Sequence, residues 1–162
     1  MDIYPKIKNL LWRVCRGYSP YSVKLRERGV DVERGCGLCR REETIDHVLR
    51  DYSKAREVWR QSGLGVALYG DTFNNILLQI LKSLETDKVQ LFCCIVWALW
   101  SARNALLWER KEQTTQQVLG NAVCMIRDWR DCSVSNSSYA ASIPSQRVAS
   151  LPTWGSSDIA GW

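Results

Sequence analysis

The sequence lacks the features of a secreted or membrane-spanning chain. No charged segment followed by an apolar segment stands at its N-terminus, as a secretory signal would require. Its longest uninterrupted apolar run, residues 91–100, has ten residues, which is too short to span a bilayer and suits a buried helix. The seven cysteines are an odd number and, without a signal, indicate a reducing compartment where thiols stay free or bind metal. We therefore expect an intracellular protein, nuclear or cytoplasmic, with no membrane partner.

A phosphate-binding loop is also missing. Gly63, Gly65 and Gly70 mark a loop, but they form neither G-x-G-x-x-G nor G-K-[ST], and no predicted strand precedes them. Apolar side chains instead recur at helical spacing along most of the chain. This spacing predicts helices over residues 5–16, 20–28, 53–61, 73–84, 88–111 and 115–131, with N-caps at Ser19, Ser53 and Asp71. Past Cys132 the periodicity stops, and residues 133–162 with their nine serines are typical of a disordered tail.

Positive charge is concentrated in the first third of the chain. Residues 1–60 hold 14 Lys and Arg against 9 Asp and Glu, whereas residues 61–162 hold eight of each. A surplus of this kind favours nucleic acid, because each cation that neutralises a phosphate releases a condensed counterion; an ordinary solvated surface is the alternative. The candidate phosphate-binding residues are Lys6, Lys8, Arg13, Arg16, Lys24, Arg26, Arg28, Arg40 and Arg41.

The strongest local pattern is a C-x-x-C turn followed by the only histidine of the chain. Cys36 and Cys39 can direct two thiolates at one point, and His47, which Thr44 can place by capping a helix, can supply a third ligand for zinc. A structural zinc site usually has four protein ligands, but no cysteine or histidine follows at short range. Asp51 could close the site, as could water. Two ordinary thiols and a partly buried histidine are the alternative.

These residues resemble a known family. The run C-x-x-C-x-x-x-E-T-x-x-H followed by A-x-x-V-W, the opening PKIKNLLWRVCRG and the W-x-x-W-x-x-R-N of residues 97–104 resemble the zinc-binding region that follows the polymerase in plant non-LTR retrotransposon reverse transcriptases. The resemblance implies that Cys36, Cys39 and His47 bind zinc. The family's fourth ligand is a cysteine, where this chain has Tyr52, and the phenol is a poor ligand. Zinc binding is therefore expected to be weak or absent.

The patterns together predict an all-α helical bundle with a small N-terminal zinc-knuckle-like turn and a disordered C-terminal tail. A basic helical region with the knuckle is expected over residues 1–62, a helical bundle region packed with it over 71–132, and the tail over 133–162. Trp12 is expected in the core, with a base-stacking platform as the alternative, and Trp59 is expected in the core. Arg103 and Asn104 are expected to form hydrogen bonds between helices, with nucleic-acid contact as the alternative.

The family's association with element RNA or target DNA implies a nucleic-acid partner. In the family a ribonuclease H domain would begin near residue 133, but that activity needs several acidic residues around metal, and this segment has only Asp158. We expect a non-catalytic RNA- or DNA-binding module derived from a retrotransposon. The alternatives are a protein-interaction or regulatory module, which docks a partner through exposed aromatic helices and keeps a purely structural knuckle with or without metal, and a non-functional relic.

Overall fold

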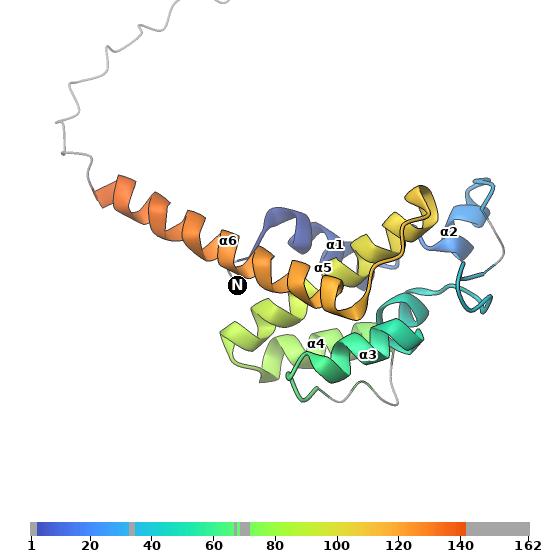
Figure 1. Ribbon diagram of the computed structural model, residues 1–162, viewed down its shortest axis with the longest axis horizontal. Coiled ribbons are helices and arrows are strands. Elements are labelled where there is room, and N and C mark those ends of the chain that lie inside the picture. Colours follow the sequence, from blue (N-terminus) through green and yellow to red (C-terminus); the bar gives the residue numbers. More distant parts are fainter. Residues whose placement is uncertain (1–2, 33–34, 67, 69–71, 142–162) are drawn as a thin grey trace, which may run out of the picture.

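The computed structural model describes residues 3–32, 35–66, 68 and 72–141, with side chains up to residue 132. Every regular element in these segments is helical, which confirms the predicted all-α class (Figure 1). The elements are α1 (Pro5–Cys15), α2 (Ser22–Glu27), the π-helical turn η1 (His47–Asp51), α3 (Ser53–Gln61), α4 (Phe73–Ser83), α5 (Thr86–Glu109) and α6 (Thr115–Ala141).

Helix α5 is the central helix of the bundle. It contacts α1, η1 and α6, and α6 also contacts α3. Aromatic rings join the layers: Phe92 of α5 stacks on Trp59 of α3 at 4.8 Å and on Phe73 of α4 at 6.1 Å between ring centroids. Trp59 is therefore a core residue, as predicted. By length and composition α5 is long and apolar enough to cross a bilayer. However, 56% of its most apolar stretch is buried inside the protein. Its apolar composition is therefore that of a central helix in a bundle.

Helix α1 packs its apolar stripe inward and ends in a Schellman motif. Ile7, Leu10, Leu11 and Val14 are buried. At its C-terminus Gly17 adopts φ 67°, and the amides of Gly17 and Tyr18 donate to the carbonyls of Val14 (3.1 Å) and Arg13 (2.8 Å). Trp12 lies off the apolar stripe and is 53% exposed, so the prediction that it lies in the core is wrong.

Helix α2 begins two residues later than predicted. Its N-cap is Tyr21 and its first residue is Ser22, whereas Ser19 is buried outside the helix. The reason lies far along the chain, because the backbone amide of Ser22 donates to the carboxylate of Glu43 at 2.9 Å. A tertiary hydrogen bond thus supplies what a local cap would have supplied.

Three further boundaries differ from the predictions. Helix α3 has Tyr52 as its N-cap, with Ser53 already inside the helix. Helix α4 is capped by Thr72, whose hydroxyl accepts from the Asn75 amide at 3.3 Å, and Asp71 lies outside the described residues. Helix α6 continues to Ala141, whereas the sequence predicted its end at residue 131; once a helix is nucleated, each added residue gains one hydrogen bond. Residues 142–162 lie outside the described residues.

Candidate metal centre

The knuckle, residues 35–41, is a tight turn closed by two backbone hydrogen bonds. The Cys36 amide donates to the Arg41 carbonyl at 2.7 Å, and the Arg40 amide donates to the Cys36 carbonyl at 2.9 Å. Gly35 adopts φ 100° and Arg40 adopts φ 56°. A Cβ at Gly35 would lie 2.7 Å from the Arg40 carbonyl oxygen, so the turn requires glycine there for both its dihedral and its space.

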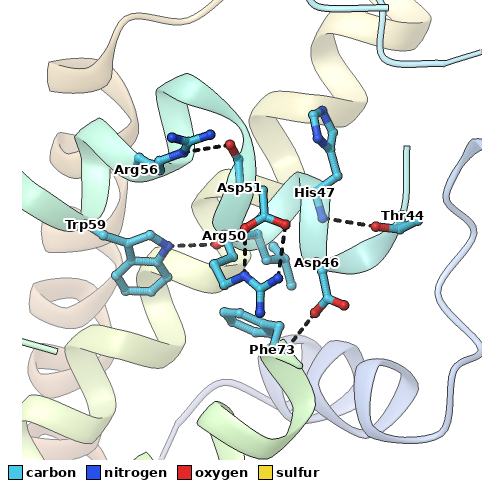
Figure 2. A network of polar contacts seen from close by, with 9 residues as sticks. Thr44, Asp46, His47, Arg50, Asp51, Arg56, Trp59 and Phe73 are labelled. Carbon is cyan, nitrogen blue, oxygen red and sulfur yellow. Dashed lines mark hydrogen bonds and ion pairs between the residues drawn. The ribbon is translucent and has the colours of Figure 1, made fainter. Parts of the chain in front are cut away.

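The histidine is placed by a capped and widened helical turn. Its backbone amide donates to the Thr44 hydroxyl at 3.1 Å, as the sequence predicted (Figure 2). At the other end of η1, the Tyr52 amide donates to the His47 carbonyl at 2.9 Å, which is the wide spacing of a π turn. Such turns occur often at functional sites.

Cys36, Cys39 and His47, here called the donor cluster, converge on one point. Their ligand atoms all lie within 4.8 Å of one another, and Cys39 Sγ lies 3.3 Å from His47 Nε2. Tetrahedral zinc with Zn–S near 2.3 Å and Zn–N near 2.0 Å requires donor separations of roughly 3.5–3.8 Å. Three donors of the right chemistry thus fit a zinc ion with little movement.

The protonation states of two donors respond to burial in different ways. Burial raises the pKa of the Cys36 thiol, and the Cys39 thiol beside it acts in the same direction. Burial lowers the pKa of His47, although Glu43 and Asp51 partly oppose this. A neutral imidazole is ready to bind metal, whereas a protonated thiol must first release its proton.

Asp51, the candidate fourth ligand, is not part of the donor cluster. Its two carboxylate oxygens accept from Arg50 Nε at 2.7 Å and from Arg50 Nη2 at 3.0 Å. Figure 2 shows this carboxylate turned toward the guanidinium. The pKa of Asp51 is lowered mainly by its hydrogen bonds to Arg50. The sequence could not reveal this bidentate pair between neighbouring residues.

Tyr52 lies beside the donor cluster in place of a fourth thiolate. Its ring centroid is 5.8 Å from that of His47. Burial, with smaller contributions from Cys36, Glu112 and Cys39, raises the pKa of the Tyr52 phenol to about 12. The phenol therefore remains neutral near pH 7, and a neutral phenol oxygen is a poor zinc ligand.

An open pocket adjoins the donor cluster. It encloses about 790 Å³, counted with the solvent at its mouth, and its walls include Cys36, His47 and Tyr52 together with Leu106 and Leu107 of α5. Because solvent can enter, water can complete the coordination of a metal held by three side chains.

A buried ion pair connects the knuckle region to the bundle. The Glu43 carboxylate accepts from Arg103 of α5 and from the Ser22 hydroxyl, the latter at 2.6 Å. The Arg103 and Glu43 side chains are only 9% and 5% exposed. Arg103 therefore links α5 to Glu43 and Ser22, as expected, whereas Asn104 accepts from its neighbour Arg103 within α5 at 2.9 Å and, among the described residues, not from another helix. Sequence reasoning missed Glu43 because a glutamate beside a knuckle gives no signal of burial.

A comparison of the chain with models of known protein families agrees with the geometry of the donor cluster. Residues 1–59 match the family model described as zinc-binding in reverse transcriptase. This segment is similar to the zinc-binding region of reverse transcriptases. The match covers about a third of the chain and ends at Trp59, so α4, α5 and α6 lie beyond it. No curated protein and no solved structure matches the chain.

The remaining cysteines lie outside the donor cluster. All seven are free thiols. Cys93 and Cys94 are buried in α5, where burial raises the pKa of their thiols to about 12 and about 11. Such thiols are unreactive and act as small apolar side chains. In the described part of the chain, the donor cluster is the one group of cysteine, histidine or acidic residues arranged to hold a metal.

Proposed function

We propose that this chain is a non-catalytic nucleic-acid-binding module built on a reverse transcriptase zinc-binding domain, acting in the nucleus or cytoplasm. The observation that carries the proposal is an uneven pairing of basic side chains. After residue 41, six basic side chains form ion pairs with acidic side chains: Arg50, Lys54, Arg60, Lys88, Arg103 and Arg130.

The basic side chains between residues 1 and 41 are mostly left unneutralised. In the described part of that segment only Lys24 has an ion pair, with Glu27 at 2.8 Å. Lys6 lies over the rings of Tyr4 and Trp97. Between residues 1 and 41 the exposed cations without an ion pair to a described residue are Lys6, Lys8, Arg13, Arg16, Arg28, Arg40 and Arg41; after residue 41 they are Arg56, Lys82, Lys111 and Arg127.

Unpaired cations are the ones that contribute to phosphate binding, because a cation already neutralised must first give up its partner. Arg40 and Arg41 lie within the knuckle itself, and the backbone of each forms one of its two closing hydrogen bonds with Cys36. Zinc, when bound, would cross-link the two cysteines to His47 and so fix the positions of these two arginines. This supports a role for the knuckle in presenting positive charge.

A gel-shift titration with RNA and DNA at several salt concentrations tests the proposal. Neutralising Lys8, Arg13 and Arg16 together to glutamine should weaken binding and reduce the slope of log affinity against log salt. Each lost phosphate contact should contribute about 0.7 for single strands or 0.9 for duplex DNA. The matched control replaces Arg60, Lys88 and Arg130 by glutamine. This removes the same charge from exposed side chains that already have ion pairs.

Comparing the two triple variants shows whether nucleic acid binds at the α1 cations or is attracted by the net charge of the protein. Equal losses in both would mean that net charge alone attracts the nucleic acid. No binding by the natural sequence at low salt would end the proposal. In that case a protein partner that survives nuclease treatment in a pull-down would support the protein-interaction alternative.

A further inference from the structure

Two aromatic rings lie together on the surface of the basic N-terminal region. Trp12 is 53% exposed and Tyr18 is 54% exposed. Their ring centroids are 5.7 Å apart and their planes are inclined by 50°. Scattered exposed aromatic residues are ordinary, but two adjacent rings that each keep more than half of their surface in water are not explained by burial of apolar area.

The backbone fixes this arrangement. Tyr18 is the second residue after the C-cap of α1, and its amide is bonded to the Arg13 carbonyl at 2.8 Å. The Schellman motif thereby folds Tyr18 back over the last turn of α1, where its ring meets that of Trp12. The motif accounts for the contact, and it would be satisfied by aliphatic side chains. It does not account for the flat, exposed faces of both rings.

Unpaired positive charge surrounds the two rings. Lys8 lies four residues before Trp12 on α1, and Arg16, the C-cap of that helix, lies four residues after it, so the three share one face. Both cations are exposed and have no ion pair among the described residues. Along about two helical turns this face presents a cation, an aromatic ring and a second cation, and its charge is complementary to a phosphate backbone.

Another exposed tryptophan shows that this combination is not general. Trp108 near the end of α5 is 60% exposed, but it has no aromatic contact in the described part of the chain, and Glu109 follows it directly. It matches Trp12 in residue type and exposure and differs in its surroundings.

We infer that Trp12 and Tyr18 form a base-stacking platform for single-stranded nucleic acid, with Lys8 and Arg16 contacting the phosphates on either side. The inference rests on the proposed function and adds the class of ligand. Unpaired bases can stack on an exposed ring whatever their sequence, whereas the bases of a duplex are already stacked on one another. Binding should therefore favour single strands and depend little on sequence.

The test measures affinity for a fluorescein-labelled 20-residue oligothymidylate and for a duplex of the same length, at fixed salt. Trp12→Ala and Tyr18→Ala should each weaken single-strand binding by about tenfold, in line with one lost stacking contact. Duplex binding and the salt slope should be unchanged, because no charge is removed. Trp12→Phe should retain most of the affinity, and Trp108→Ala should retain all of it.

A second measurement needs no variant. An oligonucleotide of the same length with abasic sites throughout keeps every phosphate and offers no base to stack. The natural protein should bind it about tenfold or more weakly than oligothymidylate. Equal binding of the abasic oligonucleotide and oligothymidylate, or equal affinities of Trp12→Ala and Trp108→Ala, would overturn the stacking platform. If that binding still depended on salt, the proposed function would stand. Absence of any binding would remove both.

Discussion

Glu43 and Arg103 form a buried ion pair across sixty residues of sequence. Glu43 lies inside the segment that matches the reverse transcriptase zinc-binding family, and Arg103 lies outside it, on α5. Ser22 of α2 donates to the same carboxylate oxygen. The knuckle region is thus fastened to the bundle by a charged group that α5 supplies, and the matched segment depends on the helix beyond its boundary.

Replacing Arg103 by methionine should destabilise the protein strongly. The change leaves the Glu43 carboxylate buried without its counter-ion, which typically costs about 3–5 kcal/mol. Chemical denaturation monitored by circular dichroism measures the loss. The matched control is Arg130→Met, because Arg130 pairs with Asp87 where both side chains are more than half exposed, and such pairs contribute less than about 1 kcal/mol. Equal losses would show that the buried pair has no special weight.

The same pair predicts how stability depends on pH. Burial alone would raise the pKa of Glu43, but Arg103 and Ser22 outweigh it and the pKa is lowered. A carboxyl with a lowered pKa stabilises the fold fully above its unfolded pKa, about 4.3, and this contribution disappears as the pH falls through the folded value. The stability difference between the natural protein and a Glu43→Gln, Arg103→Met double variant should therefore shrink below about pH 4. A difference that stays constant down to pH 2 would contradict the prediction.

Gly35→Ala should disrupt the knuckle, whereas Gly37→Ala should be tolerated. A Cβ on Gly35 meets the carbonyl oxygens of Arg40 at 2.7 Å and Arg41 at 2.8 Å, and its φ is 100°. A Cβ on Gly37 meets nothing within 4 Å, and no positive φ is required there. The expected cost at Gly35 is about 1–3 kcal/mol, with a loss of zinc affinity because the turn positions both thiols. Thermal unfolding with and without zinc measures both effects, and similar behaviour of the two variants would refute the geometry.

Tyr52→Cys should raise zinc affinity by more than about tenfold. The substitution places a thiolate beside three existing donors and completes a four-ligand site. Zinc content after purification and chelator challenge, together with a competition titration, measures the change. Tyr18→Cys is the control, because it adds a thiol at an exposed position outside the donor cluster. Stoichiometric zinc in the natural protein, with no gain from Tyr52→Cys, would show that another ligand already closes the site.

Local sequence patterns predicted the fold class and all three residues of the donor cluster. The helices follow from apolar spacing, and the convergence of Cys36, Cys39 and His47 follows from a C-x-x-C turn and a helix that begins eight residues later. Both depend on residues close in sequence, where backbone geometry leaves few arrangements. Helix ends were less predictable, because Ser22 receives its N-terminal acceptor from Glu43, 21 residues away.

The sequence by itself determined that this is a helical protein with three zinc donors in one short segment and a surplus of positive charge around them. Only the tertiary structure decided which charges remain available. Arg103 is buried against Glu43, whereas the cations of α1 stay in water with Trp12. Whether a polar side chain is neutralised or free depends on neighbours that folding brings together, and those neighbours are invisible to any local pattern.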